Sequence, residues 1–292
     1  MFNNYKSYAK LMFTQTTRRF FSSGGIQAVG ARIKSVKSIQ KITKAMKMVA
    51  ASKLKADQRR LDTGIVYAMP SQKIVNSIEP EQTIAAKTAV VVIASDKGLC
   101  GGINSSIIKA VKNLIITEVK GDALIFCIGN KVKNTMEKTY DKSMCSTFTE
   151  VTKPRFNFTT SAIVAERVLN GCFDAIYIVY NHFKSAISFE TKIIKMPSSK
   201  HASLKKGFSA FECEPEVSAL ATNLYEFNLA NTIYSCALDG LAAEQSARMT
   251  AMDNASSNAG DMLSKLTLKY NRARQSKITL ELIEIISGAN AL

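Results

Sequence analysis

The sequence predicts an α/β domain held between two long helices, one near each end of the chain, that pair as an antiparallel coiled coil. Two observations support this fold class. Both ends contain long stretches with almost no proline, in which apolar residues recur every three or four positions, whereas short runs rich in Val and Ile alternate with helical segments between them. We expect a leader over residues 1–25, an N-terminal helix with its connection over 26–79, the α/β domain over 80–205 and a C-terminal helix over 206–292.

The first 25 residues have the composition of a mitochondrial transit peptide. The first acidic residue of the chain is Asp57, and the 56 residues before it carry 12 of the 39 basic residues and none of the 23 acidic ones. Leaders of this kind are amphipathic, contain serine and lack acidic groups. We expect cleavage close to Phe20 or Phe21; the alternative is a basic tail that stays on the protein.

The stretch from Ile26 to about Leu61 predicts one long helix. About 36 residues at 1.5 Å each would extend ~54 Å, which is longer than an ordinary globular helix and requires a partner helix along its length. One stripe of this helix is apolar and consists of Ile33, Val36, Ile39, Ile42, Met46, Val49, Ala50 and Leu54.

The middle of the chain has the texture of a sheet covered on both faces. Continuous apolar runs of strand length occur at residues 88–94, 122–128 and 175–180, and helical periodicity occurs at 103–120, 130–140 and 159–169. This alternation predicts strands in mainly parallel order. Residues 185–196 predict an added strand near the edge of the sheet.

The C-terminal helix is expected to be the longer of the two. No proline follows Pro215, and apolar residues keep their helical spacing as far as Ile286. If continuous, this helix would be on the order of 100 Å long. We therefore expect part of it to run unpaired within the chain or to lie inside another protein.

The sequence contains no constellation typical of catalysis, cofactor binding or metal binding. The Gly-rich loop Ser95–Asn104 follows a strand and opens a helix, but it matches neither the dinucleotide nor the P-loop pattern, so we interpret it as a turn with Asn104 or Ser105 near the helix cap. The two histidines, His182 and His201, have no persuasive Ser or Cys partner. The six cysteines are widely spaced and form no C-x-x-C, which argues against a zinc site or a disulfide framework.

The basic charge near the N-terminus has two competing interpretations. A lysine-rich helix could bind nucleic acid electrostatically. It carries no Phe, Tyr or Trp between Ile26 and Asp62, however, so it offers no surface on which bases could stack. An acidic protein partner is the other explanation.

Four blocks of the sequence resemble the gamma subunit of rotary F-type ATP synthases. They are ARIKSV followed by ITKAMKMVAASK at residues 31–53, SDKGLCGGIN at 95–104, EQSARMTAM at 244–252 and ITLELIEIISGA at 278–289. The blocks occur in the family's order, the resemblance covers essentially residues 26–292, and the leader indicates the mitochondrial form.

The resemblance implies a non-catalytic rotor subunit, bound to the matrix side of the mitochondrial inner membrane. In this family the terminal helices form the shaft, and a Rossmann-like α/β domain forms its foot. The implied partners are the alpha and beta subunits of the catalytic hexamer, the epsilon/delta-type subunits of the central stalk and the membrane c-ring. Neither nucleic acid nor a small-molecule substrate is implied, and nucleotide and Mg²⁺ are bound by alpha and beta.

The resemblance also implies five contact residues. Met46 and Lys47 match a contact with an acidic loop of the beta subunit, and Arg248, Gln275 and Thr279 match contacts with the hexamer. The closely spaced cysteine pair of plastid relatives is not present, so thiol control is not expected. Two other functions stay open from the residues alone: a nucleotide-binding α/β enzyme with helical arms, and a basic nucleic-acid-binding coiled coil.

Overall fold

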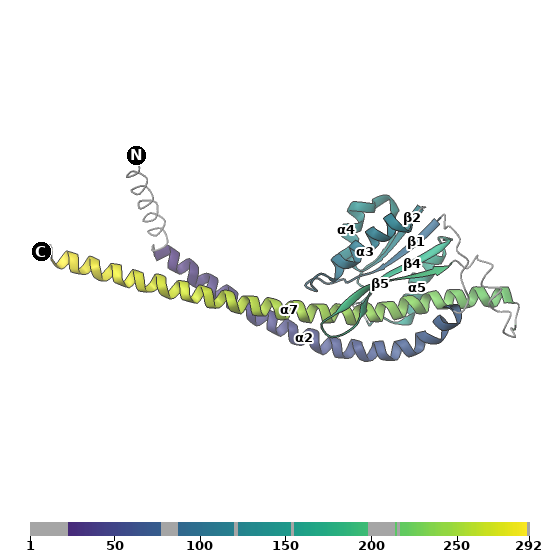
Figure 1. The fold of residues 1–292 in the computed structure, drawn as a ribbon, viewed down its shortest axis with the longest axis horizontal. Coiled ribbons are helices and arrows are strands. Elements are labelled where there is room, and N and C mark those ends of the chain that lie inside the picture. The colour runs from purple at the N-terminus through teal and green to yellow at the C-terminus, as the bar shows by residue number, and fades with distance from the viewer. Residues whose placement is uncertain are drawn as a thin grey trace. The chain divides into compact units, whose positions relative to one another are not determined.

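The computed structural model describes residues 23–76, 87–119, 122–152, 155–197, 214 and 217–290. The expected cleavage position and nearly all of the expected leader therefore lie outside the described residues. In chain order the elements are α2 (Ser23–Asn76), β1 (Lys87–Ile93), α3 (Ile103–Thr117), β2 (Asp122–Ile128), α4 (Asn130–Tyr140), the 3-10 turn η1 (Asp141–Ser143), β3 (Met144–Phe148), α5 (Phe158–Leu169), β4 (Ala175–Phe183), β5 (Phe189–Pro197) and α7 (Val217–Ala289) (Figure 1).

The strands form one five-stranded sheet in the order β3-β2-β1-β4-β5. β1 is parallel to both β2 and β4, β2 is parallel to β3, and β5 is antiparallel to β4 at the edge. The predicted strands are thereby confirmed, including the added edge strand. β3 was not predicted, because its five residues are mostly half-exposed and show no run of Val or Ile.

Both faces of the sheet are covered, which explains why the central strands contain continuous apolar runs. Ala89, Val91 and Ile93 of β1 face a core that includes α5 and the first part of α7, while Val90 and Val92 face α3 and α4. In Figure 1, α3 and α4 lie on one side of the sheet, and α5 and α7 lie on the other. Strands buried on both faces carry continuous rather than alternating apolar residues.

α2 and α7 each continue far beyond an ordinary helix. α7 has 73 residues, so it is roughly 110 Å long at 1.5 Å per residue. α2 has 54 residues and runs to Asn76, so its predicted end near Leu61 was wrong. It continues through Pro70, where the missing N–H removes a helical hydrogen bond. Packing against α7 compensates on both sides of the proline, because Ala68 and Ser71 are buried there.

The chain divides into two compact units, and α2 pairs with α7 in each of them. One unit comprises residues up to Met46 together with residues from Met252 onward, and the other comprises Lys47–Ala251. In the first unit, a Cβ added at Gly30 would lie 3.6 Å from Tyr270, and one added at Gly260 would lie 3.1 Å from Gln40.

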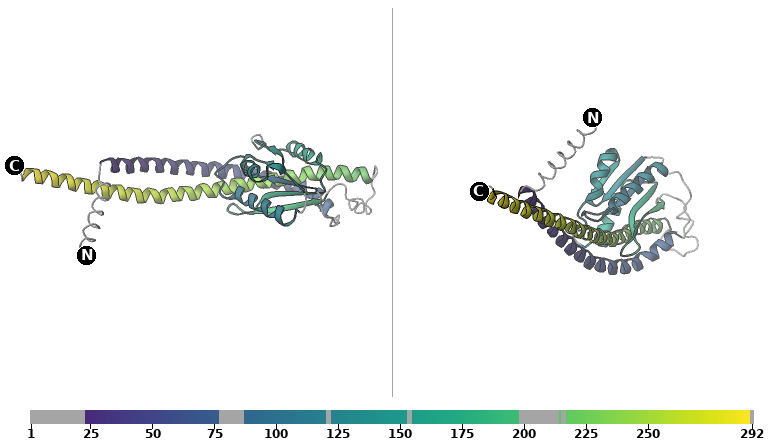
Figure 2. Two further views of the ribbon diagram at one scale, coloured as in Figure 1. Left: turned by 90° about the horizontal axis from the view of Figure 1, so that it is seen from above. Right: turned by 60° about the vertical axis from the view of Figure 1, so that its left-hand side comes forward.

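The second unit shows the same direction of pairing. Leu54 and Leu61 pack with Leu238 and Ala242, and the Gln72 side chain donates a hydrogen bond to the Ser235 hydroxyl at 3.1 Å. In both units the partner numbers fall along α7 as they rise along α2, so the predicted antiparallel coiled coil is confirmed (Figure 2). Among the described residues, no helix has an apolar stretch sufficient to cross a bilayer.

Candidate functional site

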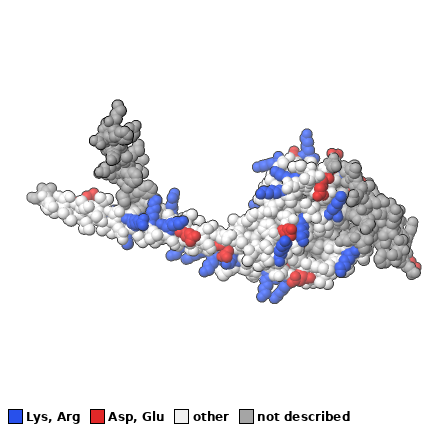
Figure 3. All heavy atoms as spheres, viewed as in Figure 1, with Lys and Arg blue, Asp and Glu red and all other residues white. Residues whose placement is uncertain are grey.

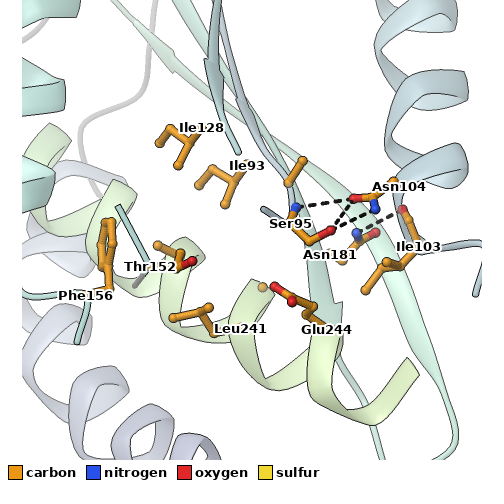
Figure 4. Close-up of a pocket in the computed structure, with 13 residues that line it drawn as sticks. Ile93, Ser95, Ile103, Asn104, Ile128, Thr152, Phe156, Asn181, Leu241 and Glu244 are labelled. Atoms are coloured by element: carbon orange, nitrogen blue, oxygen red, sulfur yellow. Dashed lines mark hydrogen bonds between the residues drawn. The ribbon is translucent and has the colours of Figure 1, made fainter. Parts of the chain in front are cut away.

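The carboxyl edge of the sheet is the position where α/β folds of this kind usually bind ligands. Strand order reverses between β1 and β4, and the crevice outside the carboxyl ends of those strands is the common ligand site. Here that crevice is largely filled by the chain itself. Gly240, Leu241 and Glu244 of α7 close it from one side (Figure 4).

The space left in the crevice is the size of a water molecule. The cavity has a volume of about 20 Å³ and is lined by Ser95, Asn104, Thr152, Asn181 and other residues of the carboxyl edge. One water requires about 10–15 Å³ of such volume. A nucleotide does not fit this cavity without displacement of α7.

The Gly-rich loop is held as a turn by its own side chains. The Asn104 amide donates to the Ser95 hydroxyl at 2.8 Å and accepts from the Ser95 backbone N–H at 3.2 Å (Figure 4). The Ser95 hydroxyl donates to the Lys97 carbonyl at 2.9 Å. The cap residue of α3 is Gly102, so Asn104 lies near the helix cap as expected, and its side chain ties the start of α3 to the end of β1.

The tip of this loop packs against α7. Cys100 is buried in a cluster with Ala243 and Ala247, and a Cβ added at Gly101 would lie 3.7 Å from Ala251. Leu99 has a φ of 64° and is 63% exposed, an uncommon combination for a bulky residue. The loop therefore presents Leu99 outward while its next residues are fixed on α7.

Arg248, one of the predicted contact residues, is paired within its own helix. Its guanidinium forms a short ion pair with Glu244 and donates to the Gln245 side chain at 2.8 Å. The Arg248 and Glu244 side chains are 14% and 10% exposed. Burial raises the pKa of Glu244, and the Arg248 charge partly opposes that rise. Any partner that binds Arg248 meets a cation already held in place by a buried carboxylate.

His182 has a partner that the sequence did not reveal. Its Nδ1 atom lies 2.6 Å from the Asp239 carboxylate, which also accepts the Phe183 backbone N–H at 2.7 Å. Asp239 thereby fastens β4 to α7, a contact that the sequence analysis did not predict. The two residues are 57 positions apart, so no local spacing could have indicated the pair. His201 lies outside the described residues.

The other four predicted contact residues lie on the surfaces of α2 and α7. Met46 is 40% exposed, Lys47 is half-buried, and Gln275 and Thr279 are exposed. The structure brings Gln275 and Thr279 together one helical turn apart, with the Thr279 hydroxyl donating to the Gln275 carbonyl at 3.0 Å. Gln275 and Thr279 belong to one compact unit, and Arg248 belongs to the other.

The C-terminal end of α7 exposes an apolar surface. Residues 281–290 are all exposed, and Figure 3 shows this end of the helix as largely uncharged. Large apolar side chains more than 45% exposed here are Ile278, Leu280, Leu282, Ile283, Ile285 and Ile286. Elsewhere, Lys and Arg are scattered along α2 and over the α/β domain (Figure 3).

Within the part of the chain that the structure describes, no cluster of three or more His, Cys, Asp or Glu residues is arranged to hold a metal ion. Five cysteines are described, all with free thiols, and Cys213 lies outside the described residues.

Comparison with known proteins gives a consistent result. The family model described as ATP synthase matches residues 25–292. The rat protein "ATP synthase F(1) complex subunit gamma, mitochondrial" is 40% identical over 275 residues, covering 91% of this chain and 99% of the relative. The sweet potato (Ipomoea batatas) protein "ATP synthase subunit gamma, mitochondrial" is 39% identical, covering 91% and 85%.

Solved structures agree with these relatives. A chain from the central stalk and c-ring of the Tetrahymena thermophila mitochondrial ATP synthase has a TM-score of 0.64 and 33% identity, covering 74% of this chain and 99% of that one. A chain from the Euglena gracilis mitochondrial ATP synthase has a TM-score of 0.77 at 21% identity, which shows a shared fold.

Proposed function

Because this chain belongs to the gamma-subunit family of ATP synthases, we propose that it works as the non-catalytic shaft of the motor. It is a central-stalk subunit of the mitochondrial enzyme, located on the matrix side of the inner membrane, and its rotation couples proton flow to ATP synthesis. The chemistry of ATP is assigned to the alpha and beta subunits. The role of this chain is to present different faces to them in turn.

The observation that best supports a mechanical role is α7 itself. A single helix of 73 residues ends in a surface of exposed Leu and Ile, which is costly to leave in water. We infer that this end is covered by the alpha and beta subunits in the assembled enzyme. A shaft acts on surrounding subunits only if its faces differ, because a ligand shifts an equilibrium only through its different affinity for the two states.

The remaining partners follow from the division of the chain. We propose that residues 26–79 and 206–292 form the shaft, and that residues 80–205 form a foot that contacts the epsilon/delta-type subunits and the c-ring. Residues 1–25 are proposed to be removed after import. Filling of the carboxyl-edge crevice by α7 supports the view that the foot is a structural domain rather than a nucleotide site.

We assign the direct contacts with the hexamer to Met46, Lys47, Arg248, Gln275 and Thr279. The basic surface of α2 complements acidic loops, and such complementarity fixes register and partner choice more than it adds affinity. The pre-positioned guanidinium of Arg248 suits recognition of a carboxylate or carbonyl group.

Met46→Lys in the assembled synthase tests this assignment. We expect normal assembly but a lower ratio of ATP synthesis to ATP hydrolysis, because the new ammonium group changes both charge and fit beside Lys47. Met48→Lys is the matched control, since Met48 is 62% exposed and two residues further along α2, on a different side of the helix. Equal effects of the two variants would contradict a specific contact at Met46.

Two measurements on the isolated chain distinguish the alternative functions. Micromolar affinity for ATP or NAD in a direct titration would support a nucleotide-binding enzyme. A salt-dependent shift of DNA that tolerates any sequence, at physiological ionic strength, would support a nucleic-acid-binding coiled coil. We expect neither.

A further inference from the structure

Asp96 connects three loops that are far apart in the sequence. One of its carboxylate oxygens accepts the backbone N–H groups of Asn130 and Glu150, each at 3.1 Å, and the other accepts the Thr152 hydroxyl at 2.7 Å. Asp96 follows β1, Asn130 follows β2, and Glu150 and Thr152 follow β3. A single side chain thus gathers the loops at the carboxyl ends of three neighbouring parallel strands.

The position of this carboxylate is the one that a bound anion commonly takes in α/β folds. Asn130 is the first residue of α4, and the N–H groups at a helix N-terminus have no partner within the helix. Such ends, at the carboxyl edge of a parallel sheet, bind phosphate in many proteins. Here the chain supplies its own negative charge, while the nearby crevice retains room for about one water.

Asp96 also lies at the start of the Gly-rich loop. The loop leaves Asp96, passes through Leu99 and Gly101, both with φ above 60°, and buries Cys100 against α7. Ala247, which packs against this loop, directly precedes Arg248. Loosening the base of the loop therefore loosens the packing beside the proposed partner contact.

We propose that Asp96 is a positioning residue that replaces a bound anion at this edge and holds the 97–102 loop against α7 beside Arg248. The functional part of this inference rests on the proposed role of the chain as the shaft. It extends that role, because Asp96 itself need not touch any partner.

The test uses the assembled synthase carrying Asp96→Ala or Asp96→Asn, with Asp174→Ala as the matched control. Asp174 also accepts one backbone N–H, from Lys87 at 3.0 Å, but at the start of β1 and so at the opposite edge of the sheet. Hydrogen exchange is measured on peptides containing Asn130 and Glu150, and ATP synthesis is measured relative to hydrolysis. Each measurement is repeated with sodium formate, a small carboxylate that can occupy the vacated position.

In Asp96→Ala we expect exchange of both amides to accelerate about tenfold or more, the effect of losing one hydrogen bond to a charged acceptor. We expect coupling to fall several-fold, and formate to restore both quantities. Asp96→Asn, which keeps an acceptor oxygen but no charge, should be intermediate. Asp174→Ala should leave the two amides and the coupling ratio unchanged, with or without formate.

Three results would overturn the inference: unchanged exchange at Asn130 and Glu150, faster exchange that formate does not reverse, or faster exchange with normal coupling. Formate rescue is decisive, because a general loss of stability would not respond to a small carboxylate. Failure of the proposed shaft role would look different. It would appear in the wild type and in Asp174→Ala alike, as ATP hydrolysis without coupled ATP synthesis.

Discussion

Gly129→Ala is expected to be among the most destabilising single-methyl changes in this protein. Gly129 connects β2 to α4 with a φ of 106° and a ψ of 138°, which residues with a side chain rarely adopt. A Cβ at this position would lie 2.4 Å from the Ala94 carbonyl oxygen and 2.7 Å from its carbonyl carbon. These are backbone atoms, and the Ala94 N–H is bonded to the Ile128 carbonyl at 2.8 Å, so they cannot move aside without breaking the sheet edge.

The size of the effect follows from two contributions. A non-glycine residue in such a conformation costs about 1–3 kcal/mol. Forcing an extra carbon into a packed site costs typically about 1–3 kcal/mol more. A total of roughly 2–6 kcal/mol is a large part of the ~5–15 kcal/mol by which a protein is usually stable. Because Asn130 is the next residue, the same shift would displace the N–H that Asp96 accepts.

The assay is urea unfolding of the full-length chain, followed by circular dichroism. Gly102→Ala is the control, because no atom lies within 4 Å of a Cβ there and its φ is −87°. Gly102 is the cap of α3, so alanine should cost no more than about 1 kcal/mol. Equal losses in the two variants, or a loss below about 1 kcal/mol in Gly129→Ala, would refute the backbone-clash argument.

Three further predictions concern the buried pair and the two surfaces of α7. Arg248→Ala should cost about 3 kcal/mol by leaving Glu244 buried without its partner, and Glu244→Gln in the same chain should recover much of that loss in urea unfolding. Burial raises the pKa of Glu244 above its ordinary 4.5, so the folded state binds the Glu244 proton more tightly than the unfolded state. The free energy of unfolding should therefore fall as pH rises from the ordinary carboxyl range through the raised pKa. Unfolding measured at a series of pH values should show a flatter profile in Glu244→Gln. Leu238→Ala, at a fully buried position, should lower the free energy of unfolding of the free chain by about 2–5 kcal/mol, measured by heat or urea. Leu282 is 53% exposed, so Leu282→Ala should change the free energy of unfolding by less than about 0.5 kcal/mol and should affect only the assembled enzyme.

Much of the architecture was predictable because it depends on local periodicity. β1, β2 and β4 each contain five or more consecutive apolar residues, as expected of strands covered on both faces. The predictions failed where packing overrides local preference. Pro70 usually ends a helix, yet α2 continues past it because Ser71 and Gln72 bond to Asn231 and Ser235 of α7.

The functional residues divide in the same way. The exposed end of α7 was predictable, since a helix much longer than its partner must leave part of itself uncovered within the chain. The Glu244–Arg248 pair was predictable, because a helix places residues with i,i+4 spacing together. The His182–Asp239 pair joins a strand to a helix, so only the tertiary structure reveals it.

The sequence by itself determined the order of helices and strands, the coiled-coil pairing and, through four blocks of residues, the family. Each of these depends on spacing along the chain or on runs of adjacent residues. Only the tertiary structure decided that α7 fills the crevice at the carboxyl edge, and that Asp96 draws three loops together there. Asp96 and Glu150 are 54 positions apart, and a hydrogen bond between such positions depends on how the strands are ordered in the sheet, which residue spacing does not record.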